Sequence, residues 1–309
     1  MSPELLIGII ITLVGASTPI LFAALGELVA EKSGVLNLGV EGMMLVGAVI
    51  CFAVTYNTGN PWLGILSAAL ASAAVSMIFA VLTLGLSANQ VATGLALTIF
   101  GTGFSALFGR AYTGKPLALF KSVFPDALAT HPLLRAVFGY SPLVYLSLAM
   151  VALVWWFLAK TRGGLILRAV GESDISAHSM GYSVIGVRYA AVAFGGAMAG
   201  IGGSCFPLML TPQWVEGLTA GRGWIALALV VFGAWRPIRL LGGAYLFGLV
   251  MTIELYAKAG GGIAHVVPSQ FWAALPYLAT ILVLVLISLR QSSNTSAPAC
   301  LGKPFLPTN

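Results

Sequence analysis

Apolar runs recur along the whole chain, and each is long enough to cross a lipid bilayer. The hydrocarbon core of a bilayer needs roughly 20 helical residues at a rise of about 1.5 Å per residue. Hydrophobic residues make up 59% of the 309 residues, and charged residues only 8%. Soluble domains of this size do not have so apolar a composition. The sequence therefore predicts an all-α polytopic membrane protein.

We expect about nine transmembrane helices, with a range of about eight to ten, in one domain over residues 1–290. The 110–140 stretch is interrupted by three prolines and is expected to be the longest loop. The tail, 291–309, is rich in Ser, Thr and Pro, and we expect it to be disordered and cytoplasmic. The predicted spans are 5–26, 38–56, 62–86, 88–109, 141–159, 187–207, 223–235, 236–257 and 271–289.

Basic residues gather in the short loops on one side of this topology. By the positive-inside rule that side is cytoplasmic, which places the N-terminus outside and the C-terminus inside. The net charge of +6 is scattered over these loops and forms no stripe, so we expect no nucleic-acid partner. The residues that define the cytoplasmic side are Lys32, Lys160, Arg162, Arg168, Arg188, Arg236, Arg239 and Arg290.

The segment from Gly26 to Ala48 breaks the apolar pattern with charged residues and glycines. A carboxylate in hydrocarbon costs roughly 2.5–3.5 kcal/mol on insertion scales, so such side chains should face protein or water. Asn37 and Glu41 are one turn apart and are expected on one helix face, where they either line a polar cavity or bind a neighbouring helix. Ion pairing at the cytoplasmic interface is expected of Glu27, Glu31 and Lys32.

A weak internal repeat links two parts of the chain. Leu36–Gly39 precedes the second predicted span, and Leu218–Gly221 precedes the seventh. Under the topology above these halves are inverted copies, unless the likeness is chance similarity between glycine-rich apolar stretches. Inverted repeats place solute sites where short, glycine-interrupted helices meet. The predicted substrate pathway therefore consists of Asn37, Gly39, Glu41, Gly42, Thr219 and Gly221.

The polar loop 160–186 is predicted to contain one short helix, from Ser173 to Met180. Ser173 is a suitable N-cap, Asp174 suits the positive end of the helix dipole, and Gly181 supplies a stop. Ile175, Ala177 and Met180 would form an apolar face for a partner protein. The alternative is a solvated connecting loop, and in either case His178 is expected to be exposed.

Three further predictions concern packing and the outer surface. Glu254 is expected to pair with Lys258 near the outer surface. The small residues of 195–203 form ridges that allow helices to approach closely. The segment 211–224 contains Gln213, Trp214, Glu216 and Arg222; we read it as an aromatic belt with paired charges, or as a contact for an extracellular donor protein or solute.

Known catalytic and nucleotide-binding patterns do not occur in the sequence. A phosphate-binding G-x-x-x-x-G-K-[ST] motif and an H-E-x-x-H motif are both missing from the sequence. Cys51, Cys205 and Cys300 have no metal-ligand spacing. We therefore expect a chain that is not an enzyme, holds no metal and binds no cofactor itself.

Two segments resemble permease subunits of bacterial ABC importers in the branched-chain amino acid/ribose-type superfamily. GELVAEKSGVLNLGVEGMMLVGA (26–48) is similar to the nucleoside-type branch that works with basic membrane lipoproteins, and RAVGESDISAHSMG (168–181) is similar to the cytoplasmic coupling helix. The likeness extends to about residue 290 and includes AGRGWIALALVVFGAW (220–235). Many members have ten spans, whereas this sequence indicates about nine.

The resemblance implies a location and partners. It implies a multi-pass protein of the bacterial inner membrane that imports a nucleoside, with a sugar or a branched-chain amino acid as alternatives. A homologous second permease, a cytoplasmic ATPase that binds ATP and magnesium, and an extracytoplasmic binding lipoprotein are the implied partners. An ion-coupled secondary transporter is the rival class, and Glu41 would be its relay. The residues implied to couple to the ATPase are Gly171, Glu172, Ser173, Asp174, Ala177 and Gly181.

Overall fold

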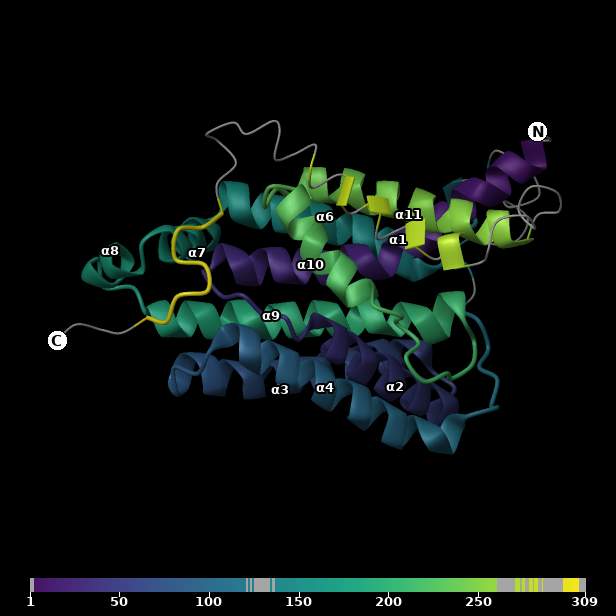
Figure 1. Ribbon diagram of the computed structural model, residues 1–309, viewed down its shortest axis with the longest axis horizontal. Coiled ribbons are helices and arrows are strands. Elements are labelled where there is room, and N and C mark those ends of the chain that lie inside the picture. The colour runs from purple at the N-terminus through teal and green to yellow at the C-terminus, as the bar shows by residue number, and fades with distance from the viewer. Residues whose placement is uncertain are drawn as a thin grey trace.

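The computed structural model describes residues 3–120, 137–259 and 297–305, with isolated residues between these ranges. Its described elements are helical (Figure 1). Seven helices within the described residues are long and apolar enough to cross a membrane, and α10 is a shorter apolar helix. The long helices are α1 Pro3–Lys32, α2 Val40–Thr58, α3 Pro61–Ala80, α4 Gln90–Gly109, α6 Pro142–Lys160, α9 Val184–Cys205 and α11 Pro237–Ala259. The shorter elements are α7 Arg162–Glu172, α8 Asp174–Ser179, α10 Arg222–Phe232, η1 Val81–Gly85, η2 Arg110–Tyr112 and η4 Phe206–Leu210.

Eight of the nine predicted spans coincide with α1, α2, α3, α4, α6, α9, α10 and α11, so the polytopic helical fold is confirmed. The ninth, 271–289, falls in part outside the described residues, and so does most of 121–136. The first helix was predicted too short: α1 continues past residue 26 to Lys32. It can do so because Glu27 and Glu31, which the sequence presents as a break, find hydrogen-bond partners inside the protein.

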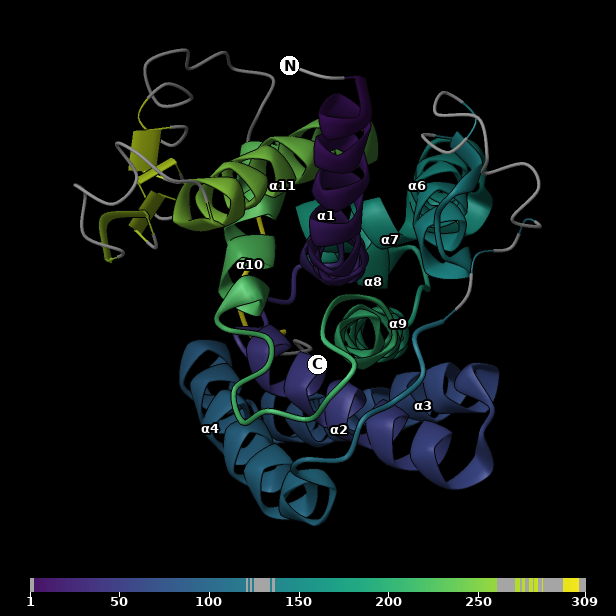
Figure 2. The same ribbon diagram turned by 90° about the vertical axis from the view of Figure 1, so that its right-hand side faces the viewer.

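The central element of the bundle is α9, which lies between α1 on one side and α2 and α3 on the other (Figure 2). Its glycines permit this position. A Cβ at Gly47 of α2 would lie 2.6 Å from the Cα of Gly200, and a Cβ at Gly202 would lie 2.7 Å from the carbonyl oxygen of Pro19 in α1. The predicted small-residue ridges are therefore packing surfaces, which is how membrane helices associate without a hydrophobic driving force.

The contact between α2 and α4 is equally close. A Cβ on Gly42 would lie 2.7 Å from the Cα of Thr98, and a Cβ on Gly101 would lie 2.5 Å from the Cα of Gly42. The Thr98 hydroxyl donates to the carbonyl of Leu38 over 3.0 Å. Gly42, which was predicted to line the substrate pathway, packs against Leu97 and Thr98 of α4.

The loop 160–186 contains two helices, not one. The helix α7 was not predicted; Thr161 caps it by accepting from the amide of Gly164 over 3.0 Å. Its buried residues are Gly164, Leu167, Val170 and Gly171, a helical spacing that the charged neighbours obscured. The predicted caps of α8 are correct: the Ser173 hydroxyl accepts from the amide of Ser176 over 3.3 Å, and Gly181 follows with a φ of +85°.

The end of the chain also departs from expectation. Residues 291–309 were predicted to be disordered, but 297–305 form a turn-rich segment that lies against α7 and the end of α1. The Cys300 amide donates to the carbonyl of Gly171 over 2.9 Å, and the Gly302 amide donates to the carbonyl of Gly34 over 3.1 Å. Polar and proline-rich composition therefore gave the wrong prediction for this stretch, because tertiary hydrogen bonds hold it in place.

Two glycines of α4 test the packing argument. We expect Gly101→Ala to lower the midpoint of thermal unfolding in detergent, because the new methyl group collides with Gly42 and overpacking typically costs about 1–3 kcal/mol. Gly103→Ala is the matched control, because nothing lies within 4 Å of a Cβ at Gly103. Equal midpoints for both variants would show that α2 and α4 are not in close contact.

Candidate functional site

The starts of α2 and α10 meet at Glu41, a buried residue in the first turn of α2. Its Oε1 accepts from the Thr219 hydroxyl over 2.5 Å and from the Gly221 amide over 2.8 Å. Its Oε2 accepts from the Gly223 amide over 2.6 Å. Gly221 is the N-cap residue of α10, so Glu41 caps a helix that lies far away in the sequence. A carboxylate at the positive end of a helix also interacts favourably with its dipole.

The two helices lead to opposite ends of the bundle. The end of α2 lies near the end of α4, where Asn57 donates to the hydroxyl of Tyr112. The end of α10 leads to Trp235, whose indole N–H donates to Glu31 near the end of α1 over 2.6 Å. The segments that the sequence pairs as repeats thus meet in space. The inverted relation between the two halves stays a hypothesis that this geometry supports.

A second cluster of hydrogen bonds holds the chain between α1 and α2. The Asn37 amide donates to Glu27 over 3.0 Å, and the Asn37 side chain accepts from the Gly39 amide over 2.9 Å. The Leu36 amide donates to the Gln90 side chain at the start of α4 over 2.8 Å. These contacts satisfy the backbone of a segment that is not helical, which the interior of a membrane protein requires.

Two predictions about these polar residues are wrong. Glu27 and Glu31 were expected to form ion pairs at the cytoplasmic interface, but they are buried and accept hydrogen bonds from Asn37 and Trp235. Asn37 and Glu41 do not share a helix face, because Asn37 lies before the start of α2. The cost of a carboxylate in hydrocarbon predicted that such side chains face protein or water, but it did not show which partners they bind.

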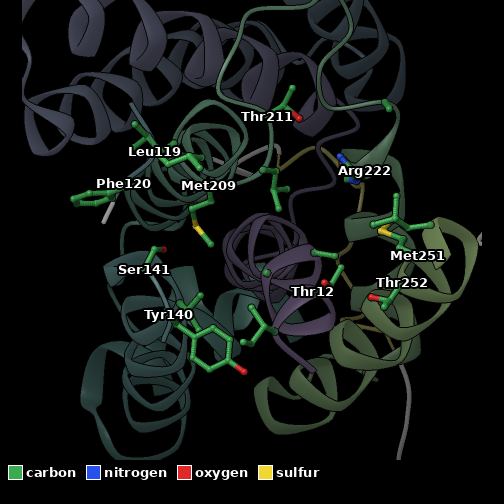
Figure 3. Close-up of a pocket in the computed structure, with 18 of the residues that line it drawn as sticks. Thr12, Leu119, Phe120, Tyr140, Ser141, Met209, Thr211, Arg222, Met251 and Thr252 are labelled. Atoms are coloured by element: carbon green, nitrogen blue, oxygen red, sulfur yellow. The ribbon is translucent and has the colours of Figure 1, made fainter. Parts of the chain in front are cut away.

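A cavity of about 800 Å³ lies beside the start of α10 (Figure 3). The six residues predicted to form the substrate pathway, Asn37, Gly39, Glu41, Gly42, Thr219 and Gly221, do not line this cavity; their nearest neighbours in the sequence that do are Ala220 and Arg222. The labelled residues surround one end of α1, with Tyr140 and Ser141 on the α6 side and Met251 and Thr252 on the α11 side. The polar side chains that line it are Thr12, Tyr140, Ser141, Thr211, Arg222, Thr252, Glu254 and Lys258.

Several of these side chains have defined surroundings. The predicted pair of Glu254 and Lys258 forms over 2.6 Å. The Arg222 guanidinium lies 5.0 Å from the centre of the Phe206 ring, a cation–π distance. Burial, with Tyr245 and Tyr145 nearby, raises the pKa of the Tyr140 phenol, which therefore stays neutral. The cavity combines hydroxyl groups, a cation and aromatic surface, and the sequence analysis singled out only Arg222, Glu254 and Lys258 among its polar lining.

The segment 211–224 also differs in part from its prediction. Trp214 is not in an exposed aromatic belt: it is only 2% exposed and fills the space beside Gly109 of α4. Gln213 pairs with Pro116 in an isolated bridge, and Glu216 is exposed. This segment therefore closes one end of the bundle, and it reaches the cavity through its first residue, Thr211, and through Ala220 and Arg222 near its end.

The opposite end of the molecule carries α7 and α8, together with most of the basic residues of the predicted cytoplasmic side. Asp174 of α8 forms an ion pair with Arg188 of α9 over 3.2 Å. Ala177 was expected to face a partner, but it is buried against Val170 and Val184. Ile175 and Met180 are 64% and 63% exposed. Gly171 is buried against the end of α1, whereas Glu172 and Gly181 are exposed.

In the part of the chain that the structure describes, no cluster of His, Cys, Asp and Glu could hold a metal ion. Cys51, Cys205 and Cys300 are free and buried. His178 is exposed, as predicted, and its ring lies 5.5 Å from that of Phe305.

Removal of the Glu41 carboxylate should destabilise the junction of α2 and α10. We expect Glu41→Ala to lower the thermal midpoint in detergent, because two buried amides lose their acceptor and each unsatisfied group costs about 1–3 kcal/mol. Glu216→Gln, an exposed site in the preceding segment, should leave the midpoint unchanged. An unchanged midpoint for Glu41→Ala would mean that other groups cap α10.

Comparison with known proteins places this geometry in a family. Residues 9–287 match the branched-chain amino acid transport system permease component family. A Haloferax volcanii protein named as a glucose ABC transporter permease, TsgC13, is 41% identical over 96% of this chain and 97% of its own length. The guanosine ABC transporter permease NupQ of Bacillus subtilis is 32% identical over 96% and 95%. The nucleoside ABC transporter permease NupC of Lactococcus lactis is 30% identical over 87% and 89%.

Permeases of this kind transport and do not catalyse a reaction, and they work with an ATP-hydrolysing subunit and a substrate-binding protein. The helices that can span a membrane agree with such a role. The resemblance seen in 26–48 and 168–181 is thereby confirmed. The chain belongs to the branched-chain amino acid transport system permease family and is a multi-pass cell-membrane subunit of an ATP-binding cassette transporter.

Proposed function

We propose that this permease imports a nucleoside. The cavity beside α10 carries the proposal, because its aromatic rings and hydroxyl groups suit a neutral solute with a flat base and a ribose. Bases stack on aromatic side chains such as Phe120 and Tyr140, and hydroxyl groups of the ribose exchange hydrogen bonds with Thr and Ser. The relatives named for guanosine and nucleoside transport support this solute class.

A hexose is the second candidate. The relative named for glucose has the higher identity, 41%, and hydroxyl groups with aromatic rings also suit a sugar. A branched-chain amino acid fits less well, because its ammonium and carboxylate groups would each need a charged partner in the cavity. Of the charged groups there, Glu254 and Lys258 already pair with each other.

An ion-coupled mechanism has little support in the geometry. Glu41 was its expected relay, but both carboxylate oxygens accept hydrogen bonds from α10 and Thr219. A relay must exchange protons or ions with water, whereas Glu41 is only 7% exposed. Its carboxylate caps the start of α10 instead. Transport driven by a separate ATPase agrees better with such a fixed junction.

In this proposal the ATPase docks on α8, and ATP and magnesium bind to the ATPase rather than to this chain. The exposed Ile175, Met180 and Tyr182 provide an apolar surface at the end that we assign to the cytoplasm. Apolar residues that protrude from a short helix outside the bilayer need a protein partner to cover them. The binding protein would deliver solute at the opposite end, next to the cavity, and a homologous second permease would complete the pore.

Import would then proceed by alternating access. Closure of the ATPase subunits around ATP would move α8 and open the cavity to the outside, and hydrolysis would reverse the change. ATP and solute can shift the balance between the two states only by their differential affinity for them. The proposal therefore requires a physical link between α8 and the junction at Glu41.

The docking surface can be tested with one side chain. We expect Ile175→Asp to abolish co-purification of the ATPase subunit, because a buried, unpaired carboxylate at an interface costs far more than the lost apolar contact. Ile175→Leu keeps the apolar surface and should retain the complex. Co-purification of the ATPase with Ile175→Asp at the wild-type ratio would place the docking site elsewhere.

The solute can be identified with the purified complex and its binding protein. We expect guanosine or uridine, rather than glucose or leucine, to raise the melting temperature of the binding protein and to be taken up into vesicles. Tyr140→Ala should raise the half-saturating concentration by about three- to tenfold through loss of ring contact, and Tyr140→Phe should not. Competition by glucose, without competition by nucleosides, would favour the hexose.

A further inference from the structure

The C-terminal segment 297–305, which we call the strap, is attached to three elements at the α8 end of the molecule (Figure 1). Its backbone amides donate hydrogen bonds to the carbonyl of Gly171 at the end of α7 and to the carbonyl of Gly34 after α1. The Cys300 thiol donates to the carbonyl of Glu172 over 3.6 Å. The Phe305 side chain covers the cluster formed by Val170, Ala177 and Val184. The strap thus joins the α7–α8 pair to the chain that leads into α2.

Arg188 of α9 binds three segments at this end of the molecule through its side chain: the residues after α1, the strap and α8. It is fully buried, at 0% exposure. Its Nε donates to the carbonyl of Ser33 over 3.1 Å, its Nη1 to the carbonyl of Lys303 over 3.3 Å, and its Nη2 to Asp174 over 3.2 Å. A planar guanidinium can serve three acceptors in fixed directions, which a lysine ammonium cannot do from the same position.

The backbone around this side chain leaves little room for independent movement. A Cβ on Gly171 would collide with the carbonyl of Lys32, so α7 rests directly on the end of α1. Gly34 adopts a φ of +93°, and a Cβ there would lie 2.9 Å from Nη2 of Arg188. Close-packed contacts of this kind transmit a displacement instead of absorbing it.

The segment after Gly34 leads to the candidate site. Residues 35–39 are held by Glu27 and Gln90, and two residues further on Glu41 caps α10 beside the cavity. A continuous series of hydrogen bonds therefore runs from Asp174 on α8 through Arg188 and the strap to the α1–α2 segment. By contrast, α8 itself has six residues and buries only Ala177, so it has little other attachment within the described residues.

We propose that Arg188 and the strap are positioning elements that transmit movement of α8 to the α2–α10 junction, and that transport needs this link. The inference rests on the proposed docking of an ATPase at α8. It assigns a function to residues 297–305, which the composition predicts to be disordered. Physical coupling of two sites requires such an element whose arrangement both sites can bias.

The first experiment removes the strap from the assembled transporter. A chain that ends at Ser296 should still co-purify with the ATPase, but solute-stimulated ATP hydrolysis and uptake should fall about tenfold, within the range of network mutations. A chain that ends at Phe305 keeps every contact described above and is the matched control. Uptake by the shorter chain at the rate of the control would overturn the proposal.

The second experiment needs neither ATPase nor solute, so its failure differs from failure of the proposed function. We expect Cys300 of the detergent-solubilised wild-type protein to react slowly with a maleimide, and about tenfold faster in Arg188→Lys, where the strap loses its hydrogen bond from the guanidinium to the Lys303 carbonyl. Arg239→Lys, an exposed arginine, should not change the rate. Rapid labelling of Cys300 in the wild type, with uptake intact, would show that the strap is not held against α7 and the end of α1. The proposal that the protein is an importer would be unaffected.

Discussion

A helix that begins inside a membrane protein exposes its first amides where no water can bind them. At its 11 residues, α10 is too short to cross a bilayer, so one of its ends must lie within the membrane-spanning region. The Glu41 carboxylate satisfies two of these amides, because it accepts hydrogen bonds from the N–H groups of Gly221 and Gly223. The carboxylate that looks costly in the sequence is therefore what allows α10 to start where it does. The cavity lies beside this fixed start, which contributes Arg222 and Ile225 to its lining.

The rest of the bundle supports this junction from two directions. The glycines of α9 bring α1, α2 and α3 close to one another, so the start of α2 is held from the side. The segment after α1 is held in place by hydrogen bonds to the side chains of Glu27 and Gln90 and by the backbone hydrogen bonds of Gly34. Movement of α8 can therefore reach the junction through packed backbone. Such an arrangement suits a subunit that carries no catalytic groups of its own and depends on another protein for energy.

Local properties of the sequence predicted the helices well. Long apolar runs located eight spans, and the caps of α8 followed from Ser173 and Gly181, because capping depends on residues within one turn. The i,i+4 pair of Glu254 and Lys258 was correct for the same reason. The errors came where local composition was polar but the tertiary structure supplied partners. Thus α7 was missed, and 297–305 was assigned to a disordered tail.

Hydrophobic length is read directly along the chain, so the residues alone identify a helical membrane protein and the positions of most of its helices. The sequence also marked Glu27, Glu31 and Glu41 as residues that need partners. The identities of those partners became visible in the folded arrangement of the helices. The donors to Glu41 lie 178 to 182 positions away, and Trp235 lies 204 positions from Glu31. A hydrogen bond forms between neighbours in space, and the order of residues does not state which distant segments become neighbours.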